Sequence, residues 1–266
     1  SGGYILGQEV KAFESEFASY IGVEHGIGVG SGTETLHLAL RTCGIGAGDE
    51  VVTVSHSAVA TVAAIELAGA TPVLVDIQPD DYTLDPAHLH VAITTRTRAI
   101  VPVHLYGHPA DLDPIMAIAQ RHQLWVVEDA TQGVDAYYRG RGLGSIGHLG
   151  AYSFHETKNL VAGEGGALCI NDTELVRRAE IIRDKGTNRQ EFLRGSVDKY
   201  TWVDVGSSYT PSEIACAFLT AQLESLDFVS NRRQSIYEYY QHHLAPLETA
   251  GVLRGPACPA DCVTNH

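Results

Sequence analysis

Positively charged residues are scarce in this sequence of 266 residues. It contains 18 lysine and arginine residues against 32 aspartate and glutamate residues, which gives a formal net charge of −14. A nucleic-acid-binding protein needs a dense cationic surface to neutralise phosphates. The charge balance therefore argues against a nucleic-acid partner, although backbone amides and a few cations could still hold a single phosphate group.

Long apolar segments are also lacking. No run approaches the roughly 20 residues that a helix needs to span a bilayer, and the N-terminus does not show the basic and then apolar pattern of a signal peptide. We therefore predict no membrane association and a cytoplasmic location. With 44% hydrophobic residues, the chain can bury a core for one large domain and part of a second.

Cysteine is infrequent, and its odd number of widely scattered positions does not indicate a disulfide framework. The five positions are Cys43, Cys169, Cys216, Cys258 and Cys262. The last two form a C-x3-C-x3-H spacing with His266, but no fourth ligand is evident and the surrounding GPACPADC is typical of a loop. We therefore predict no metal site and mostly buried, apolar cysteines.

Helix and strand patterns alternate along most of the chain. Apolar spacing predicts helices over residues 10–22, 33–44, 58–69 and 113–123, and short apolar runs predict strands over 49–55, 71–77, 98–104 and 124–130. A glycine-containing hairpin is expected over 136–145, followed by helices over 173–185, 211–226 and 227–244. This alternation predicts an α/β fold with a mostly parallel central sheet and helices on both faces.

One segment in the middle of the chain points to covalent chemistry. SFHETKNL (153–160) places Lys158 between the strand-like GAYSF and the glycine-rich AGEGGALCIND, which predicts a tight turn between two strands. Upstream, VVEDATQG ends a buried strand at Asp129, with Gln132 three residues later. Each residue alone also fits an ordinary loop or helix cap. Together they match a pyridoxal phosphate enzyme, which needs a lysine, an anion beside the pyridine nitrogen and hydroxyls and amides around the phosphate.

A phosphate site is indicated by GVGSGTETLH (28–37). Gly32 and Thr33 fall at the exit of a strand and the start of a helix, where free amides and the helix dipole favour an anion. Ser153 precedes the lysine turn, and ligands of parallel sheets bind at the carboxyl ends of the strands. A dinucleotide site is not expected, because GIGVGSGTE contains G-x-G-x-G in place of G-x-G-x-x-G.

Several segments together resemble the DegT-type nucleotide-sugar aminotransferases, which are fold-type-I pyridoxal phosphate enzymes. They are GSGTETLHLAL, TPVLVDIQPDDYTLDP, VPVHLYGHPADLDPI, VVEDATQG, and SFHETKN followed by GEGG. The resemblance covers nearly the whole chain. Within the family, HETKN and KGTNRQEFLRGSVDKYTWVDVGSSY look most like the transaminases that form dTDP-4-amino-4,6-dideoxygalactose, whereas AVATVAAIELAGATPV also resembles the branch that acts on 3-keto sugars.

The resemblance implies roles for individual residues. Lys158 would bond covalently to pyridoxal 5′-phosphate and carry a proton during amino transfer. Asp129 would pair with the pyridinium nitrogen, and Gln132 would form a hydrogen bond with the 3′ oxygen. The phosphate would be held by Gly32, Thr33 and Ser153, together with Ser208 of a neighbouring subunit.

The resemblance also implies an organisation and a reaction. We expect a homodimer with shared active sites, a large cofactor-binding domain over residues 1–226 and the incomplete beginning of a small C-terminal domain over 227–266. The expected reaction moves an amino group, from glutamate, to the keto carbon of a dTDP-linked 4-keto-6-deoxyhexose. Two alternatives are a 3-keto-6-deoxyhexose aminotransferase and a cofactor-retaining binding or regulatory protein without turnover.

The sequence departs from the family pattern at two places. Many relatives have an aromatic residue over the cofactor ring where this chain has Ala58, and His56 is a candidate to cover the ring instead. The frequent R-x-H-G segment is replaced by Arg183, Asp184, Lys185 and Gly186. Relatives also continue beyond the end of this chain, which is why the small C-terminal domain is expected to be incomplete.

Overall fold

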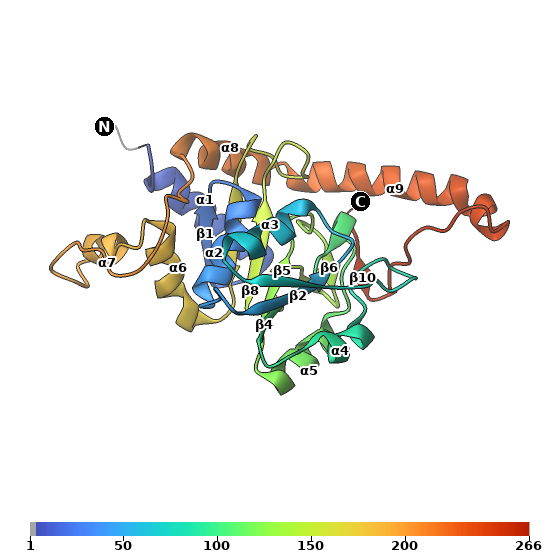
Figure 1. Ribbon diagram of the computed structural model, residues 1–266. Coiled ribbons are helices and arrows are strands. Elements are labelled where there is room, and N and C mark those ends of the chain that lie inside the picture. Colours follow the sequence, from blue (N-terminus) through green and yellow to red (C-terminus); the bar gives the residue numbers. More distant parts are fainter. Residues whose placement is uncertain (1–3, 266) are drawn as a thin grey trace.

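A seven-stranded sheet forms the centre of the computed structural model, which describes residues 4–265 (Figure 1). The strand order is β1-β9-β8-β5-β4-β2-β3. The strands are β1 (His25–Val29), β2 (Glu50–Val54), β3 (Thr71–Val75), β4 (Thr97–Val101), β5 (Trp125–Asp129), β8 (Leu149–Ser153) and β9 (Gly166–Ile170). Within this sheet β9 is antiparallel to both neighbours and the other pairings are parallel, so the predicted mostly parallel sheet is confirmed.

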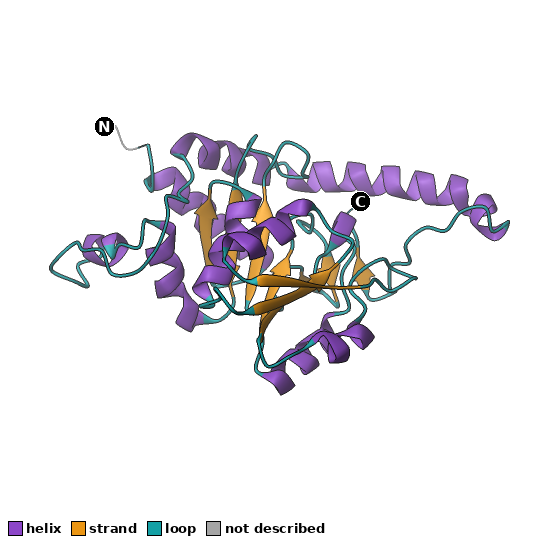
Figure 2. Ribbon diagram, viewed as in Figure 1, coloured by secondary structure: helices purple, strands orange, loops and turns teal. Residues whose placement is uncertain are grey.

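Helices cover both faces of the sheet (Figure 2). One face packs against α2 (Gly32–Thr42), α3 (Val59–Leu67) and α6 (Val176–Arg183). The other packs against α1 (Gln8–Ile21), α4 (Leu89–Ala92), α5 (Leu112–His122) and α8 (Glu213–Leu223). In β5, Val126 belongs to the core beneath α5 and Val127 to the core beneath α2, because successive side chains of a strand point to opposite faces.

Four buried aromatic side chains fix α1 against the end of β8. Phe17 lies nearly perpendicular to Tyr152, with ring centroids 4.9 Å apart, and Phe13 lies edge-on to Phe154 at 5.4 Å. All four are essentially inaccessible to solvent. Removing one such ring costs about 3–5 kcal/mol. This cluster therefore anchors the chain immediately before the segment that carries Lys158.

A small second sheet lies beside the central one. The hairpin β6 (Tyr137–Tyr138) and β7 (Arg141–Gly142) forms within the predicted range 136–145. The strand β10 (Cys262–Val263), near the end of the described chain, pairs antiparallel with β6. The last residues described are therefore next to the segment that follows β5.

The predicted helices near the end of the chain form with shifted boundaries. The long helix α9 (Leu226–Thr249) extends away from the body in Figure 1, and only its first residue is buried. The helix predicted over 173–185 starts as the 3₁₀ turn η3 (Thr173–Leu175), because the Asp172 side chain accepts a hydrogen bond from the Glu174 backbone and fixes that turn. The division into domains at residue 226 stays a prediction.

Two short helices and two further 3₁₀ turns were not expected from the sequence. They are α4, α7 (Arg189–Leu193), η1 (Pro86–His88) and η2 (Leu105–Gly107). None of them is longer than five residues, so none could show a helical apolar period. Within the described residues, no helix is both long and apolar enough to cross a membrane.

Candidate active site

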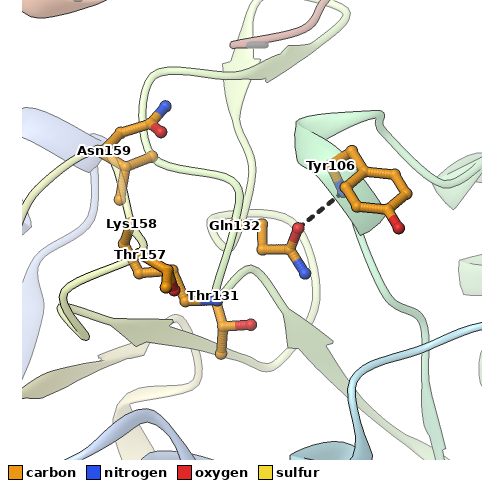
Figure 3. Close-up of a pocket in the computed structure, with 7 residues that line it drawn as sticks. Tyr106, Thr131, Gln132, Thr157, Lys158 and Asn159 are labelled. Carbon is orange, nitrogen blue, oxygen red and sulfur yellow. Dashed lines mark hydrogen bonds between the residues drawn. The ribbon is translucent and has the colours of Figure 1, made fainter.

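The predicted site residues gather at the carboxyl ends of the parallel strands. β5 ends at Asp129, β8 ends at Ser153, and Gly32 begins the helix that follows β1. A cavity of about 280 Å³ opens at this edge (Figure 3). The residues that line it are Tyr106, Thr131, Gln132, Val134, Thr157, Lys158 and Asn159.

Lys158 lies on a turn between β8 and β9, as predicted. The base of this loop is closed by a hydrogen bond of 2.8 Å from the Phe154 backbone N–H to the Gly165 carbonyl. Further along, Gln222 of α8 accepts from the Val161 backbone N–H at 3.1 Å and donates to the Val161 carbonyl. The lysine is therefore carried by a loop that is held by both the sheet and a neighbouring helix.

The Lys158 ammonium is in an unusual electrostatic setting. Burial lowers the pKa of this group below its usual value, and the nearby Asp129 carboxylate opposes that shift. Among the described residues, none accepts a hydrogen bond from Nζ or forms an ion pair with it. The amine is thus available to a ligand in the cavity, and more of it is neutral than for an exposed lysine at the same pH.

Asp129 is buried and held by two threonine side chains. Its Oδ1 accepts from the Thr131 hydroxyl at 2.7 Å and from the Thr131 backbone N–H at 3.2 Å. Its Oδ2 accepts from the Thr61 hydroxyl at 2.7 Å. Only 2% of Asp129 is exposed. Hydrogen bonds of this kind fix the orientation of the buried carboxylate.

A second buried carboxylate, that of Glu128, lies next to Asp129 in β5. Glu128 accepts from three backbone N–H groups of segment 144–147 at 2.6–2.7 Å and from His104 Nε2 at 3.0 Å. His104 Nδ1 accepts from the Ala110 backbone, which assigns the ring proton to Nε2. Burial by itself would raise the pKa of Glu128, but these donors hold it below its usual value. Glu128 therefore has a structural role.

The Gln132 amide is oriented by the backbone of Tyr106. Tyr106 has a left-handed conformation (φ 54°, ψ 28°), which is uncommon for a non-glycine residue. Its N–H donates to Gln132 Oε1 at 3.0 Å (Figure 3). The amide oxygen is thus engaged, and the Nε2 group on the other arm of the amide remains for a ligand.

Gly32 and Ser153 are in direct contact where α2 begins. A Cβ atom at position 32 would lie 2.5 Å from the Ser153 Cβ, so only glycine permits this approach. Ser31 caps α2 by accepting from the Glu34 backbone N–H. The backbone N–H groups of Gly32 and Thr33 precede the first intrahelical hydrogen bonds and point out of the helix end. Such a cradle suits a phosphate.

Of the predicted positions, Gln132 and Lys158 line the cavity. Asp129, Gly32, Thr33 and Ser153 lie at the same edge of the sheet without lining it, and Ser208 and His56 do not line it either. Ser208 is exposed and pairs with Asp184 in an isolated antiparallel bridge, and the adjacent Tyr209 carbonyl accepts from the Gly30 backbone N–H at 2.8 Å. His56 is exposed and stands 6.2 Å from the Tyr106 ring, centroid to centroid. The suggestion that it covers a cofactor ring stays a prediction, as does the role of Ser208.

The departure at 183–186 affects packing. Arg183 is buried and forms an ion pair with Glu14 of α1, while Asp184 pairs with Lys185. The charged side chains of this segment thus form ion pairs within the protein.

The prediction for the cysteines is only partly correct. Cys169 and Cys216 are buried, whereas Cys43, Cys258 and Cys262 are partly exposed. Within residues 4–265 no group of three or more histidine, cysteine, aspartate or glutamate side chains could hold a metal ion. His266, the third member of the C-x3-C-x3-H spacing, lies outside the described residues.

The donor set fits pyridoxal 5′-phosphate. It combines an amine without a protein partner, a hydrogen-bonded carboxylate, a free amide nitrogen and a helix end that only glycine permits. Sequence reasoning missed Thr61, Tyr106 and Gln222. Thr61 and Gln222 lie on helices that were predicted, but nothing in the pattern showed which of their side chains reach this site.

Comparison with known proteins places these features in one family. The model of the DegT/DnrJ/EryC1/StrS aminotransferase family matches residues 1–265. The chain is 43% identical over 253 residues to a dTDP-3-amino-3,4,6-trideoxy-α-D-glucose transaminase of Streptomyces venezuelae, covering 95% of this chain and 64% of that protein. It is 41% identical over 245 residues to a dTDP-3-amino-3,6-dideoxy-α-D-galactopyranose transaminase of Aneurinibacillus thermoaerophilus (92% and 65%). A pleiotropic regulatory protein of Geobacillus stearothermophilus is 42% identical over 232 residues (87% and 60%).

Solved structures agree in fold. S. venezuelae DesV in complex with a ketimine intermediate superposes with a TM-score of 0.88 at 42% identity, covering all of this chain and 68% of that one. NtdA from Bacillus subtilis with bound cofactor PMP gives a TM-score of 0.89 at 28% identity (99% and 59%). The chain thus spans about two thirds of the length of such relatives and has the fold-type-I α/β architecture. With its family model matched over nearly every residue, this chain belongs to the DegT/DnrJ/EryC1/StrS aminotransferase family.

Proposed function

We propose that this chain carries the cofactor site of a pyridoxal phosphate-dependent aminotransferase that acts on a nucleotide-linked keto sugar. The observation that carries the proposal is the Lys158 amine, which faces the cavity without a protein partner and has a lowered pKa. The cofactor, when bound, supplies an electron sink for the carbon that exchanges its amino group. A lysine that loses its proton readily suits both covalent attachment of the cofactor and proton transfer.

The other residues would hold and orient the cofactor. Asp129 would accept a hydrogen bond from the protonated ring nitrogen, because its buried carboxylate is held in place by two threonine donors. Gln132 would donate from Nε2 to the 3′ oxygen, since its Oε1 is occupied by Tyr106. The amides of Gly32 and Thr33 would bind the phosphate together with the Ser153 hydroxyl.

Ser208 would complete the phosphate site of a second subunit. Its side chain is exposed rather than directed into the cavity of its own chain, which supports this arrangement. The proposed assembly is therefore a homodimer in which each site uses residues of both chains.

The relatives favour a 3-keto sugar over the 4-keto sugar expected from HETKN and the 185–209 segment. Two similar proteins, at 43% and 41% identity, are named as transaminases that place the amine at C3 of dTDP-linked deoxyhexoses. The segment AVATVAAIELAGATPV points the same way. We propose a dTDP-linked 3-keto-6-deoxyhexose as the substrate and glutamate as the amino donor, with the 4-keto sugar as the second candidate.

An absorbance spectrum of the purified protein, taken before and after adding excess glutamate, tests this function. Bound cofactor should absorb at about 410–430 nm, glutamate should remove that band, and Lys158→Ala should change it. Lys11→Ala is the matched control, because Lys11 is exposed on α1 and is not among the residues that line the cavity. Amino transfer to dTDP-linked 3-keto and 4-keto sugars, with NMR of each product, then identifies the carbon.

A regulatory protein that keeps the cofactor without turnover is a second candidate. The observation in its favour is the 42% identity to a protein named as a pleiotropic regulator. It predicts a cofactor band that glutamate leaves unchanged. Absence of any band after incubation with pyridoxal phosphate would contradict both candidates.

A further inference from the structure

The Thr61 hydroxyl connects the buried Asp129 carboxylate to an outer loop. Thr61 lies in the first turn of α3 and is 1% exposed. Its Oγ1 is 2.7 Å from Asp129 Oδ2 and 2.6 Å from Ser57 Oγ. Ser57 belongs to the loop between β2 and α3, and it is partly accessible. Three hydrogen-bonded polar groups therefore link the partly accessible loop between β2 and α3 to the end of β5.

The direction of the hydrogen bonds among Ser57, Thr61 and Asp129 follows from the number of hydroxyl protons. A charged carboxylate only accepts, so Thr61 must donate its single hydroxyl proton to Asp129. The Ser57–Thr61 contact must then be made with the Ser57 proton. Ser57 donates to Thr61, and Thr61 donates to Asp129. Two hydroxyls in such a chain polarise each other, which strengthens the second bond.

The two oxygens of Asp129 are occupied unequally. Oδ1 accepts from both the hydroxyl and the backbone N–H of Thr131, which uses its two lone-pair directions. Oδ2 accepts only from Thr61 among the described residues, so one lone-pair direction remains on that oxygen. A ring N–H that reaches Asp129 would therefore share Oδ2 with the Thr61 hydroxyl.

We infer that Thr61, oriented by Ser57, is a positioning residue that holds Asp129 Oδ2 toward the ring nitrogen of the cofactor. This inference rests on the proposed function. Thr61 acts through the carboxylate and touches neither the cofactor nor the substrate. Without the Thr61 hydroxyl, Asp129 keeps its Thr131 contacts but loses the donor that fixes the direction of the free lone pair on Oδ2.

The test compares two variants with two ligands. Thr61→Val removes the hydroxyl at nearly constant volume, and Thr61→Ser keeps it as the matched control. Pyridoxal phosphate carries the ring nitrogen, whereas 1-deazapyridoxal phosphate has a carbon in its place. Dissociation constants for both ligands are measured on each protein by absorbance, and thermal unfolding midpoints show that each variant is folded.

The expected result depends on the ring nitrogen. Thr61→Val weakens pyridoxal phosphate binding about tenfold, as for the loss of one hydrogen bond to a charged group, and Thr61→Ser stays within about twofold. With the deaza ligand, Thr61→Val binds like the unmodified protein. Ser57→Ala, which leaves the Thr61–Asp129 bond in place, shows a smaller loss with the same dependence on the ring nitrogen.

Two outcomes overturn the inference alone. One is that Thr61→Val and Thr61→Ser bind pyridoxal phosphate equally well. The other is that Thr61→Val weakens both ligands to the same extent, which would indicate a general packing defect. A cofactor band that is missing from the unmodified protein would instead overturn the proposed function, and this inference with it.

Discussion

At the scale of single residues, Gly32 is important because it has no Cβ atom. In Gly32→Ala the new Cβ would lie 2.5 Å from the Ser153 Cβ, which is part of a buried strand end and cannot swing away. Overpacking of this kind costs about 1–3 kcal/mol. We expect a lower free energy of unfolding in urea and a clear loss of pyridoxal phosphate affinity, because the helix end must move away from Ser153.

The control for this variant is Gly165→Ala. Gly165 is also buried and near the lysine loop, but its added Cβ would come no closer than 3.5 Å to Ala162 and Phe154, an ordinary contact distance. Its stability and cofactor affinity should be close to those of the unmodified protein. Equal effects at both positions would contradict the proposed phosphate cradle.

The Lys158 amine gives a pH-dependent prediction. Burial lowers its pKa in the native state below the ordinary value of 10.5, so between these two values the unfolded chain binds more protons than the native chain. Stability contributed by this group therefore rises as the pH rises through that window. Lys158→Met, which has no charge to bury, should be more stable than the cofactor-free protein at neutral pH.

The measurement is the free energy of unfolding of both proteins in denaturant at several pH values. The advantage of Lys158→Met should shrink as the pH approaches 10.5, and comparing the two proteins cancels the titration of their common tyrosines and cysteines. A difference that stays constant with pH would mean that the native amine is as well solvated as an exposed one.

A site residue can be predicted from the sequence when it belongs to a short motif, and not when its role depends on a contact with a residue distant along the chain. Asp129, Gln132 and Lys158 sit in short motifs, and the structure brings them to one edge of the sheet. Thr61 is 68 residues away from Asp129 along the chain and meets it only because α3 folds back on the sheet. Tyr106 contributes through its backbone N–H, which its side-chain identity does not reveal.

At the scale of elements, α8 holds the lysine loop through Gln222. Its side chain makes two hydrogen bonds with the backbone of Val161, three residues after Lys158. Each such bond contributes about 0.5–1.5 kcal/mol. Gln222→Ala should therefore lower stability by about 1–2 kcal/mol and speed hydrogen exchange at the Val161 amide, since the loop can then open locally.

Gln222→Glu separates the two bonds. It keeps an acceptor for the Val161 N–H but lacks the amide donor for the Val161 carbonyl, so protection of the Val161 amide should fall between that of the Ala variant and the unmodified protein. Unchanged exchange in Gln222→Ala would show that the loop is held by its own backbone bonds, such as Phe154 to Gly165.

The sequence predicts some helices and strands better than others. The buried strands are recognisable because each contains a short apolar run, and β2, β5, β8 and β9 are buried in nearly every position. α7 could not be recognised, since it has five residues and none is buried. The boundary of η3 depends on a cap from Asp172, which competes with the helical period read from the apolar residues.

At the scale of the whole molecule, exposed apolar side chains gather along one segment. Phe192, Leu193, Trp202, Val203 and Val205 are between 44% and 75% exposed, and Trp202 is the most exposed of them. Large exposed apolar groups of this kind mark interaction sites in soluble proteins. Ser208 follows three residues after this segment and is exposed as well. These features support the proposed homodimer with a shared phosphate site.

Mixing two inactive variants tests whether the sites are shared. Lys158→Ala removes the covalent amine, and Ser208→Asp places a negative charge where the phosphate of the other subunit would bind. In mixed dimers one site receives both defects and the other receives neither, so an equal mixture that exchanges subunits freely should recover about a quarter of the unmodified activity. The activity is measured as amino transfer from glutamate. If each chain instead formed its site alone, mixing would restore nothing, and an active Ser208→Asp protein would remove Ser208 from the phosphate site.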